Sequence, residues 1–281
     1  MVKWGSFDLF AGFSPKTNTM NPSIQLTERQ AGITELLCDE GFLSVEELSE
    51  KYRVTTQTIR RDLTILCDYG LARRRHGGIE KSVTPKNLAY QSRQILLRGA
   101  KRAIARNVVR HIPNGSSVAF SIGTTPEVVA LELLHHRGLR IFTNNLNIAM
   151  LFCSHSSFEV HIAGGRVRNS DCDVLGPGME AFLSSYMFDF GIYGVGGVDE
   201  SGTLLDFSEE EVRARQRIHE NSRTAVLVLD HSKFGRTAHV RGGHITEASM
   251  VFCDATPPHR ITAALHSANS NLMICDEDSI R

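Results

Sequence analysis

The sequence predicts an α/β protein in which an N-terminal winged helix-turn-helix precedes a C-terminal domain built on a parallel sheet. Three amphipathic segments and a glycine-tipped arm stand near the start of the chain, and strands alternate with helices through the remainder. The length of 281 residues suits two domains of ordinary size. A hydrophobic share of 41% and a charged share of 22% are typical of globular proteins.

The first predicted helix covers residues 27–39. It places Ile33, Leu36 and Leu37 on one face, which is the periodicity of an amphipathic helix. Gly41 follows directly, and glycine there is a stop signal because it adopts the left-handed backbone that ends many helices.

The second and third helices also have defined starts. Ser44, with Glu47 three residues later, forms a capping box ahead of an apolar face. The third helix begins at Thr55 or Thr56 and ends before Gly70, with Ile59, Leu63 and Leu66 directed inward. Three short helices joined by tight turns predict a helix-turn-helix unit.

Residues 71–79 predict a short hairpin arm, the wing, because a run of arginines leads to Gly77 and Gly78. The whole chain is electrically neutral, with 31 Lys and Arg against 31 Asp and Glu. Between residues 51 and 81, however, eight Lys and Arg face three acids, a net charge of +5. The neutral total therefore excludes a protein that is basic throughout, but residues 51–81 still form one basic module.

The third helix and the wing predict a surface that binds double-stranded DNA. A helix fits the major groove, where Gln and Arg side chains donate to base edges, and hydroxyls at a helix N-terminus suit phosphates. Wing arginines would reach the backbone or the minor groove. The alternative interpretation is a charged, solvated helix. The candidate DNA-binding residues are Ser44, Thr55, Thr56, Gln57, Thr58, Arg60, Arg61, Arg73, Arg74, Arg75 and His76.

Beyond a polar stretch with Pro85, the pattern predicts helices and strands in alternation, which implies a parallel sheet covered on both faces. The predicted strands lie near 117–121, 139–142, 158–163, 188–194, 225–229 and 250–252. The predicted helices lie at 101–111, 126–134, 146–153, 179–185 and 209–220. The predicted units are an extension (1–22), the winged helix-turn-helix (23–80), a linker or connecting helix (81–98), a ligand-binding domain (99–256) and a weakly ordered tail (257–281).

Polar turns after three of these strands predict a phosphate site. Gly123, Thr124 and Thr125 follow a strand and open a helix, with Thr125 predicted as N-cap and Pro126 at the first helical position. Backbone N–H groups, hydroxyls and a helix N-terminus there would hold an anion. Asn144, Asn145, Gly164 and Gly165 repeat the arrangement after the next strands, and Lys233 is a candidate positive charge. Taken singly, such turns are usually only tight turns.

The chain resembles the DeoR family of bacterial transcription regulators over residues 25–258. Within that family it is most similar to repressors of glycerol-3-phosphate regulons. The motifs that carry the resemblance are Arg29-x3-Ile33-x3-Leu37, Thr55–Leu63, Arg75–Gly78, Ile112–Gly115, Ile122–Glu127, Thr143–Asn147 and Asp230–Arg236.

The resemblance implies a winged-helix operator reader joined to a sugar-phosphate-sensing domain similar to ribose-5-phosphate isomerase. It also implies an effector contact at Glu211. Two positions depart from the family pattern: Ser121 and Ser208 stand where relatives commonly have Asp. The resemblance therefore still implies a phosphate site, with Ser121 as a candidate effector-binding residue. It leaves the identity of the sugar open.

The expected function is repression of a carbohydrate or sugar-phosphate catabolic operon, released by a phosphorylated sugar or polyol. Three alternatives remain: an opine (sugar phosphodiester) catabolism repressor, an activator, or a sugar-phosphate isomerase, which would need a general base beside its substrate. A single winged helix covers little DNA, so a homodimer or homotetramer is expected.

No cofactor or metal is expected. The glycines at 194, 196 and 197 do not open a helix as a dinucleotide fingerprint does, and the histidines lack metal-ligand spacing. Six scattered cysteines read as buried or incidental thiols. The acids at 199, 200, 206, 209, 210 and 211 read as a solvated face, apart from the role that the resemblance gives Glu211.

No membrane span is expected, since the apolar runs are only strand-sized, and the first nineteen residues have no continuous apolar region. A cytoplasmic location is expected. These nineteen residues are an optional extension, or translation starts at Met20.

Overall fold

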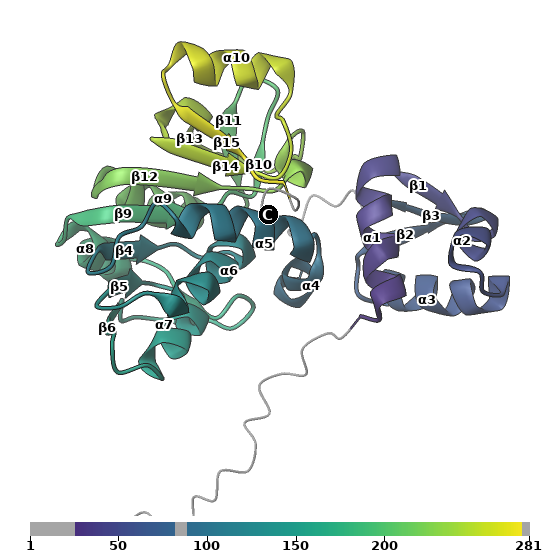
Figure 1. Cartoon of the computed structure of the whole chain (residues 1–281), viewed down its shortest axis with the longest axis horizontal. Coiled ribbons are helices and arrows are strands. Elements are labelled where there is room, and N and C mark those ends of the chain that lie inside the picture. The colour runs from purple at the N-terminus through teal and green to yellow at the C-terminus, as the bar shows by residue number, and fades with distance from the viewer. Residues whose placement is uncertain (1–25, 82–88, 277–281) are drawn as a thin grey trace, which may run out of the picture.

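The computed structural model of the protein describes residues 26–81 and 89–276, and in them two domains are joined through the short helix α4 (Tyr90–Ile95) (Figure 1). The sequence predictions for the extension 1–22, for a start at Met20 and for most of the linker before α4 lie outside the described residues.

The smaller domain is the predicted winged helix-turn-helix. Its elements are α1 (Glu28–Glu40), β1 (Phe42–Ser44), α2 (Val45–Tyr52), α3 (Thr56–Asp68), β2 (Ala72–Arg75) and β3 (Gly78–Lys81). The caps explain these limits: Thr27 and Ser44 both form capping boxes, Thr55 accepts from the N–H of Thr58, and Gly41 ends α1 at φ +76°.

The wing is an antiparallel sheet in the order β1-β3-β2. Gly78 lies so close to β1 that an added Cβ would come within 2.0 Å of the Leu43 carbonyl oxygen. A partly buried ion pair and a buried hydrogen bond fix α3 against α1, because Arg29 Nε and Gln30 Nε2 donate to Asp62 over 2.6 and 2.8 Å. Helix α3 therefore has a fixed orientation within this domain.

The larger domain has a seven-stranded, fully parallel sheet in the order β15-β14-β12-β9-β4-β5-β6. The strands are β4 (Ser117–Phe120), β5 (Arg140–Thr143), β6 (Glu159–Ile162), β9 (Phe188–Tyr193), β12 (Ser222–Val228), β14 (Met250–Cys253) and β15 (Asn271–Ile274). The first six are the six strands that the sequence predicted.

Helices cover both faces of this sheet, as the apolar strands require. On β12, Val226 and Val228 enter a core with α5 (Arg98–Val109), α6 (Thr124–Glu132) and α7 (Leu146–Cys153). Ala225 and Leu227 point the other way, toward α8 (Pro177–Ser184), α9 (Glu209–Glu220) and α10 (His259–Ser267).

The prediction of a weakly ordered tail after residue 256 was wrong for the described residues. α10 buries Ile261 and Leu265 in the core, and β15 pairs in parallel with β14 at the edge of the sheet. These two elements are held by tertiary contacts with the sheet, which the local sequence does not show. Smaller strands complete the domain: β7 (Val167–Arg168) with β8 (Asp173–Val174), and β10 (Gly197–Val198) with β11 (Thr203–Asp206) and β13 (Val240–His244).

The chain order creates a switch point in the sheet. From β4 the chain builds outward through β5 and β6, and from β9 it builds outward in the opposite direction through β12, β14 and β15. In parallel sheets, ligands bind beyond the carboxyl ends of the strands at such a point. The crevice between β4 and β9 is therefore where a ligand site is expected.

Candidate functional site

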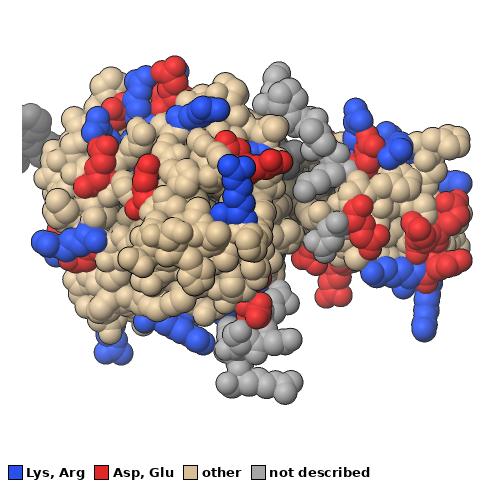
Figure 2. Space-filling view, turned by 90° about the horizontal axis from the view of Figure 1, so that it is seen from above, with Lys and Arg blue, Asp and Glu red and all other residues tan. Residues whose placement is uncertain are grey.

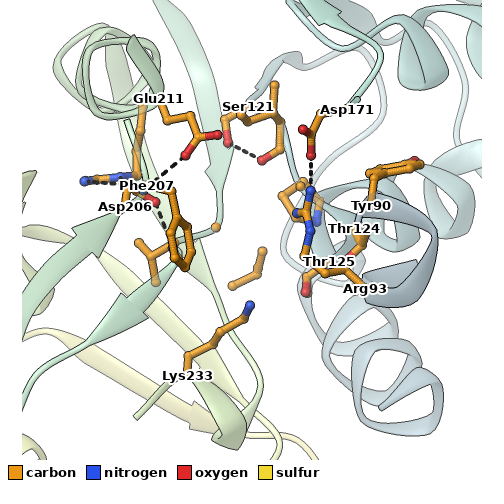
Figure 3. Close-up of a pocket in the computed structure, with 18 of the residues that line it drawn as sticks. Tyr90, Arg93, Ser121, Thr124, Thr125, Asp171, Asp206, Phe207, Glu211 and Lys233 are labelled. Carbon is orange, nitrogen blue, oxygen red and sulfur yellow. Dashed lines mark hydrogen bonds and ion pairs between the residues drawn. The ribbon is translucent and has the colours of Figure 1, made fainter. Parts of the chain in front are cut away.

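A pocket lies at this switch point, where loops that follow β4, β9 and β12 converge (Figure 3). Residues 121–126 come after β4, residues 194–196 after β9, and Lys233 lies in the turn η2 (His231–Lys233) that follows β12. The pocket is small, with a free volume of about 60 Å³. Asp206, Phe207 and Glu211 close it from β11 and the start of α9.

One wall of the pocket is the N-terminus of α6. Gly123 occupies the N-cap with φ +134°, a conformation that favours glycine, and helical geometry begins at Thr124. The predicted assignment of Thr125 as N-cap and Pro126 as first helical residue was therefore wrong, since the flexible Gly123 lets the helix start earlier. The N–H groups at such a helix start have no partner within the helix, so they can bind an anion.

Lys233 supplies a positive charge opposite this helix start, and its side chain points into the pocket (Figure 3). Burial lowers its pKa to about 7, although nearby Asp230 acts to raise it. Arg236 lies beside it, with Nη1 donating to the Gly196 carbonyl over 3.2 Å and the guanidinium 5.1 Å from the Phe207 ring centroid. This part of the pocket suits a negatively charged ligand.

The acids of the pocket are each paired with an arginine. Arg215 donates to the buried Asp206 over 3.0 Å, and Arg168 donates to Glu211 over 2.6 Å. Asp171, in the β7–β8 loop, pairs with Arg93. The prediction that residue 206 belongs to a solvated face was wrong, because β11 carries Asp206 inward, where burial raises its pKa against the effect of Arg215.

Helix α4 also reaches the pocket, through Tyr90 and Arg93. The Tyr90 hydroxyl donates to Glu127 on α6, and Asn145 and Asn147 donate to the same carboxylate over 2.8 and 3.2 Å. Burial, followed by the charge of Glu127, raises the pKa of Tyr90. A polar network thus attaches α4 to the starts of α6 and α7.

The pocket brings together six of the ten predicted effector residues: Ser121, Gly123, Thr124, Thr125, Glu211 and Lys233. Asn144, Asn145, Gly164 and Gly165 lie outside its lining, because β5 and β6 are on the far side of β4 from β9. Asn145 caps α7, and Asn144 donates to the Val174 carbonyl.

Sequence reasoning missed several lining residues: Tyr90, Arg93, Asp171, Asp206, Phe207, Arg215 and Arg236. Arg236 could have been predicted from the sequence, since it ends the motif that begins at Asp230. Arg93 carried no signal, because its partner Asp171 is 78 residues away and comes close only in the folded chain.

The predicted DNA-binding residues lie along α3 and the wing. Gln57, Arg60, Arg61 and the wing arginines are exposed, and Figure 2 shows basic side chains projecting from the edges of the smaller domain. Several of the predicted DNA-binding residues also form ion pairs or hydrogen bonds within the domain. Arg73 pairs with Glu80, Arg74 donates to the Arg60 carbonyl over 3.2 Å, and the Ser44 hydroxyl donates to Glu47 over 2.7 Å.

Within residues 26–81 and 89–276, no group of three or more His, Cys, Asp or Glu could hold a metal ion, and the cysteines of these ranges are free thiols. No helix in the same ranges is long and apolar enough to cross a bilayer.

Comparison with known proteins identifies both domains. Residues 29–84 match the family described as DeoR-like helix-turn-helix domain, and residues 98–255 match the DeoR C terminal sensor domain. The glycerol-3-phosphate regulon repressor of Escherichia coli (strain K12) is 43% identical over 89% of this chain and 99% of its own length. The protein of the same name from Haemophilus influenzae is 41% identical over 88% and 96%. A solved structure of ribose 5-phosphate isomerase A from Methanocaldococcus jannaschii is similar at TM-score 0.35 and 15% identity, over 48% of this chain and 53% of that one. The chain belongs to the DeoR family of transcription regulators.

Proposed function

We propose that the protein is a DNA-binding transcriptional repressor of a carbohydrate or sugar-phosphate catabolic operon. In this proposal, a phosphorylated sugar or polyol binds the pocket and releases the protein from double-stranded operator DNA. The observation that carries the proposal is the combination, in one chain, of a basic winged helix with a pocket in which Lys233 faces the N-terminus of α6.

In the proposed complex, α3 enters the major groove. Gln57, Arg60 and Arg61 contact base edges or phosphates, and residues 55, 56 and 58 contact phosphates at the start of the helix. Arg75 and His76, which are exposed at the end of the wing, contact the backbone or the minor groove. Ser44, Arg73 and Arg74 contribute from the base of the wing.

In the proposed effector complex, the phosphate lies on the N–H groups and hydroxyls of Thr124 and Thr125, with Lys233 opposite. Ser121 and Glu211 face the remainder of the ligand. Because two similar proteins are named glycerol-3-phosphate regulon repressors, sn-glycerol-3-phosphate is the first compound to test.

The paired acids favour a regulator over an isomerase. A general base must be able to accept a proton from the substrate carbon. Asp206, Glu211 and Asp171 each form an ion pair with an arginine, so their carboxylate oxygens already accept hydrogen bonds within the protein. We therefore expect binding of sugar phosphates without turnover.

The proposed assembly is a homodimer or homotetramer that binds repeated half-sites, since one winged helix buries too little surface for specific binding. Sedimentation of the complex with a duplex of one or two half-sites would give the number of chains bound.

A thermal-shift screen tests the effector class. The compounds are sn-glycerol-3-phosphate, D-ribose-5-phosphate, D-glucose-6-phosphate and, as matched controls, the same compounds without phosphate. A ligand at 100 times its dissociation constant stabilises the folded state by about 2.7 kcal/mol. We expect stabilisation by at least one phosphorylated compound and by none of the controls; failure of every phosphorylated compound would contradict the proposed effector class.

A further inference from the structure

Helix α4 contacts both domains. On one side, Ser92, which is 1% exposed, donates through Oγ to the Tyr69 carbonyl over 2.7 Å. Tyr69 is the C-cap of α3, the helix proposed to read DNA. Ile95 and Leu96 pack against the core of the winged helix. One side of α4 thus packs against the winged-helix domain, and Figure 1 shows α4 between the two domains.

The opposite side of α4 forms part of the pocket. Arg93 stands next to Thr124 and Thr125, and its guanidinium points toward Asp171 (Figure 3). The ion pair between them is largely buried, with side chains 14% and 15% exposed. The guanidinium lies 5.6 Å from the Tyr90 ring centroid, which holds it against the helix that carries it.

The Arg93–Asp171 pair helps to make the pocket small. The free volume of about 60 Å³ is room for about five water molecules, less than a sugar phosphate occupies. On another side of α4, a groove of about 720 Å³ lies between Gln91 and Gln94 of α4 and residues Leu26 and Glu35 of the winged-helix domain. There is space into which α4 can move when the pocket enlarges.

We propose that Arg93 binds the anionic group of the effector and that the effector replaces Asp171 as its partner. This exchange shifts α4 and so changes how the C-terminal end of α3 is held. The inference rests on the proposed function, because it assigns a further residue to the effector site and a route from that site to the DNA-binding helix.

The surroundings of the pair suit such an exchange. A phosphate carries more charge than a carboxylate and can accept two hydrogen bonds from a guanidinium, so it competes well for Arg93. Asp171 keeps a second partner after the exchange, since Arg168 Nε lies 3.7 Å from its Oδ2. Leu97, between α4 and α5, has φ +50°, and Lys101 donates to the Leu96 carbonyl over 2.6 Å. Lys101 also donates to the Arg93 carbonyl, so these contacts tie the backbone of α4 to the start of α5, while the Arg93 side chain projects into the pocket and can change its partner.

The test compares three variants of the full chain: Arg93→Gln, Asp171→Asn and, as a matched control, Arg110→Gln, which removes the same charge from an exposed position at the C-terminal end of α5. Calorimetry measures binding of sn-glycerol-3-phosphate, D-ribose-5-phosphate, D-glucose-6-phosphate and inorganic phosphate. We expect Arg93→Gln to weaken binding on the order of tenfold or more and Asp171→Asn to strengthen it severalfold. The control should bind like the wild type.

A second readout is affinity for a DNA duplex that the wild type selects from a random-sequence pool, measured without effector. Both variants break the same ion pair, so each should weaken DNA binding. The double variant should bind DNA no more weakly than either single variant.

Opposite effects of the two substitutions on effector binding distinguish the inference from general damage to the fold, which would weaken binding in both. If the wild type binds a phosphorylated compound and both variants bind it equally well, or both bind it more weakly, the inference is wrong and the proposed function stands. If the wild type binds none of the compounds, the inference and the proposed effector class are both wrong.

Discussion

Binding of a phosphorylated effector should take up a proton from solution at mildly alkaline pH, and Lys233 is the group that receives it. In the ligand-free protein its pKa is about 7, so at pH 8 roughly nine of ten molecules carry a neutral amine. A phosphate dianion beside the amine favours the charged form and raises the pKa again. Binding should therefore take up about 0.9 proton at pH 8 and about 0.5 at pH 7.

The sign of the pH dependence follows from this uptake. Below pH 7 Lys233 is already charged, and the affinity is limited only by the phosphate, whose second pKa is about 6. Above pH 7 each binding event must recruit a proton, so the dissociation constant rises toward about tenfold per pH unit until the pKa of the bound state is reached.

Calorimetry at pH 8 in two buffers of different ionisation enthalpy measures the uptake directly. The matched control is Lys233→Arg, which stays charged over this range and should bind with no uptake and with an affinity nearly constant from pH 7 to 9. A wild-type protein that takes up no proton at pH 8, and whose affinity does not change between pH 7 and 9, would refute the role given to Lys233.

Four other changes have defined outcomes. Arg61→Ala should weaken binding to the selected duplex on the order of tenfold and lower the slope of log affinity against log salt by about 1. The control is Arg110→Ala, which removes an exposed arginine of the larger domain and should change neither the affinity nor the slope. Equal slopes for both variants would argue against α3 as the helix that reads DNA. Gly123→Ala places a Cβ 3.2 Å from Pro126 at φ +134°, so titration calorimetry should show effector binding about tenfold weaker with DNA binding retained. Asp62→Ala leaves Arg29 and Gln30 without their shared acceptor, so urea unfolding should show the winged helix destabilised by about 2–3 kcal/mol; an unchanged midpoint would show that this ion pair contributes nothing. Deleting residues 257–281 removes α10 and β15 from the core and should lower the midpoint of thermal unfolding by at least about 10 °C, whereas a true tail could be removed without effect.

The helix limits in the smaller domain were predictable because short-range chemistry sets them. Ser44 and Glu47 are three residues apart, and Gly41 acts on the helix that it follows, so the sequence alone contains the interaction. Six of the seven strands of the large sheet were predictable for a similar reason, since an apolar run between two polar turns has few alternatives in an α/β chain.

The pocket was predictable only in part, because it depends on the order of strands in the sheet. The turn at Gly123 was found from its residues alone, but equivalent turns after β5 and β6 were assigned to the same site. Neighbouring strands lie about 4.8 Å apart, so those turns are carried away from the crevice between β4 and β9. No local pattern indicates on which side of β4 the chain continues.

The contribution of α4 could not be predicted. Tyr90 and Arg93 lie in a polar stretch with the composition of a linker, and their partners Glu127 and Asp171 are 37 and 78 residues away. The same holds for Asp206, whose burial depends on the pairing of β11 with its neighbours and on Arg215. Each of these residues acquires its role through tertiary contacts.

The most direct test of the account is the affinity of the full-length protein for its selected duplex, measured by fluorescence anisotropy with and without a saturating concentration of the phosphorylated compound that stabilises it best. If that compound releases DNA through the pocket, the affinity should fall by about 5- to 150-fold for each coupled site, and the compound without its phosphate should have no effect. An unchanged DNA affinity, at a concentration where calorimetry shows the pocket to be filled, would contradict the central claim that one chain couples the two sites.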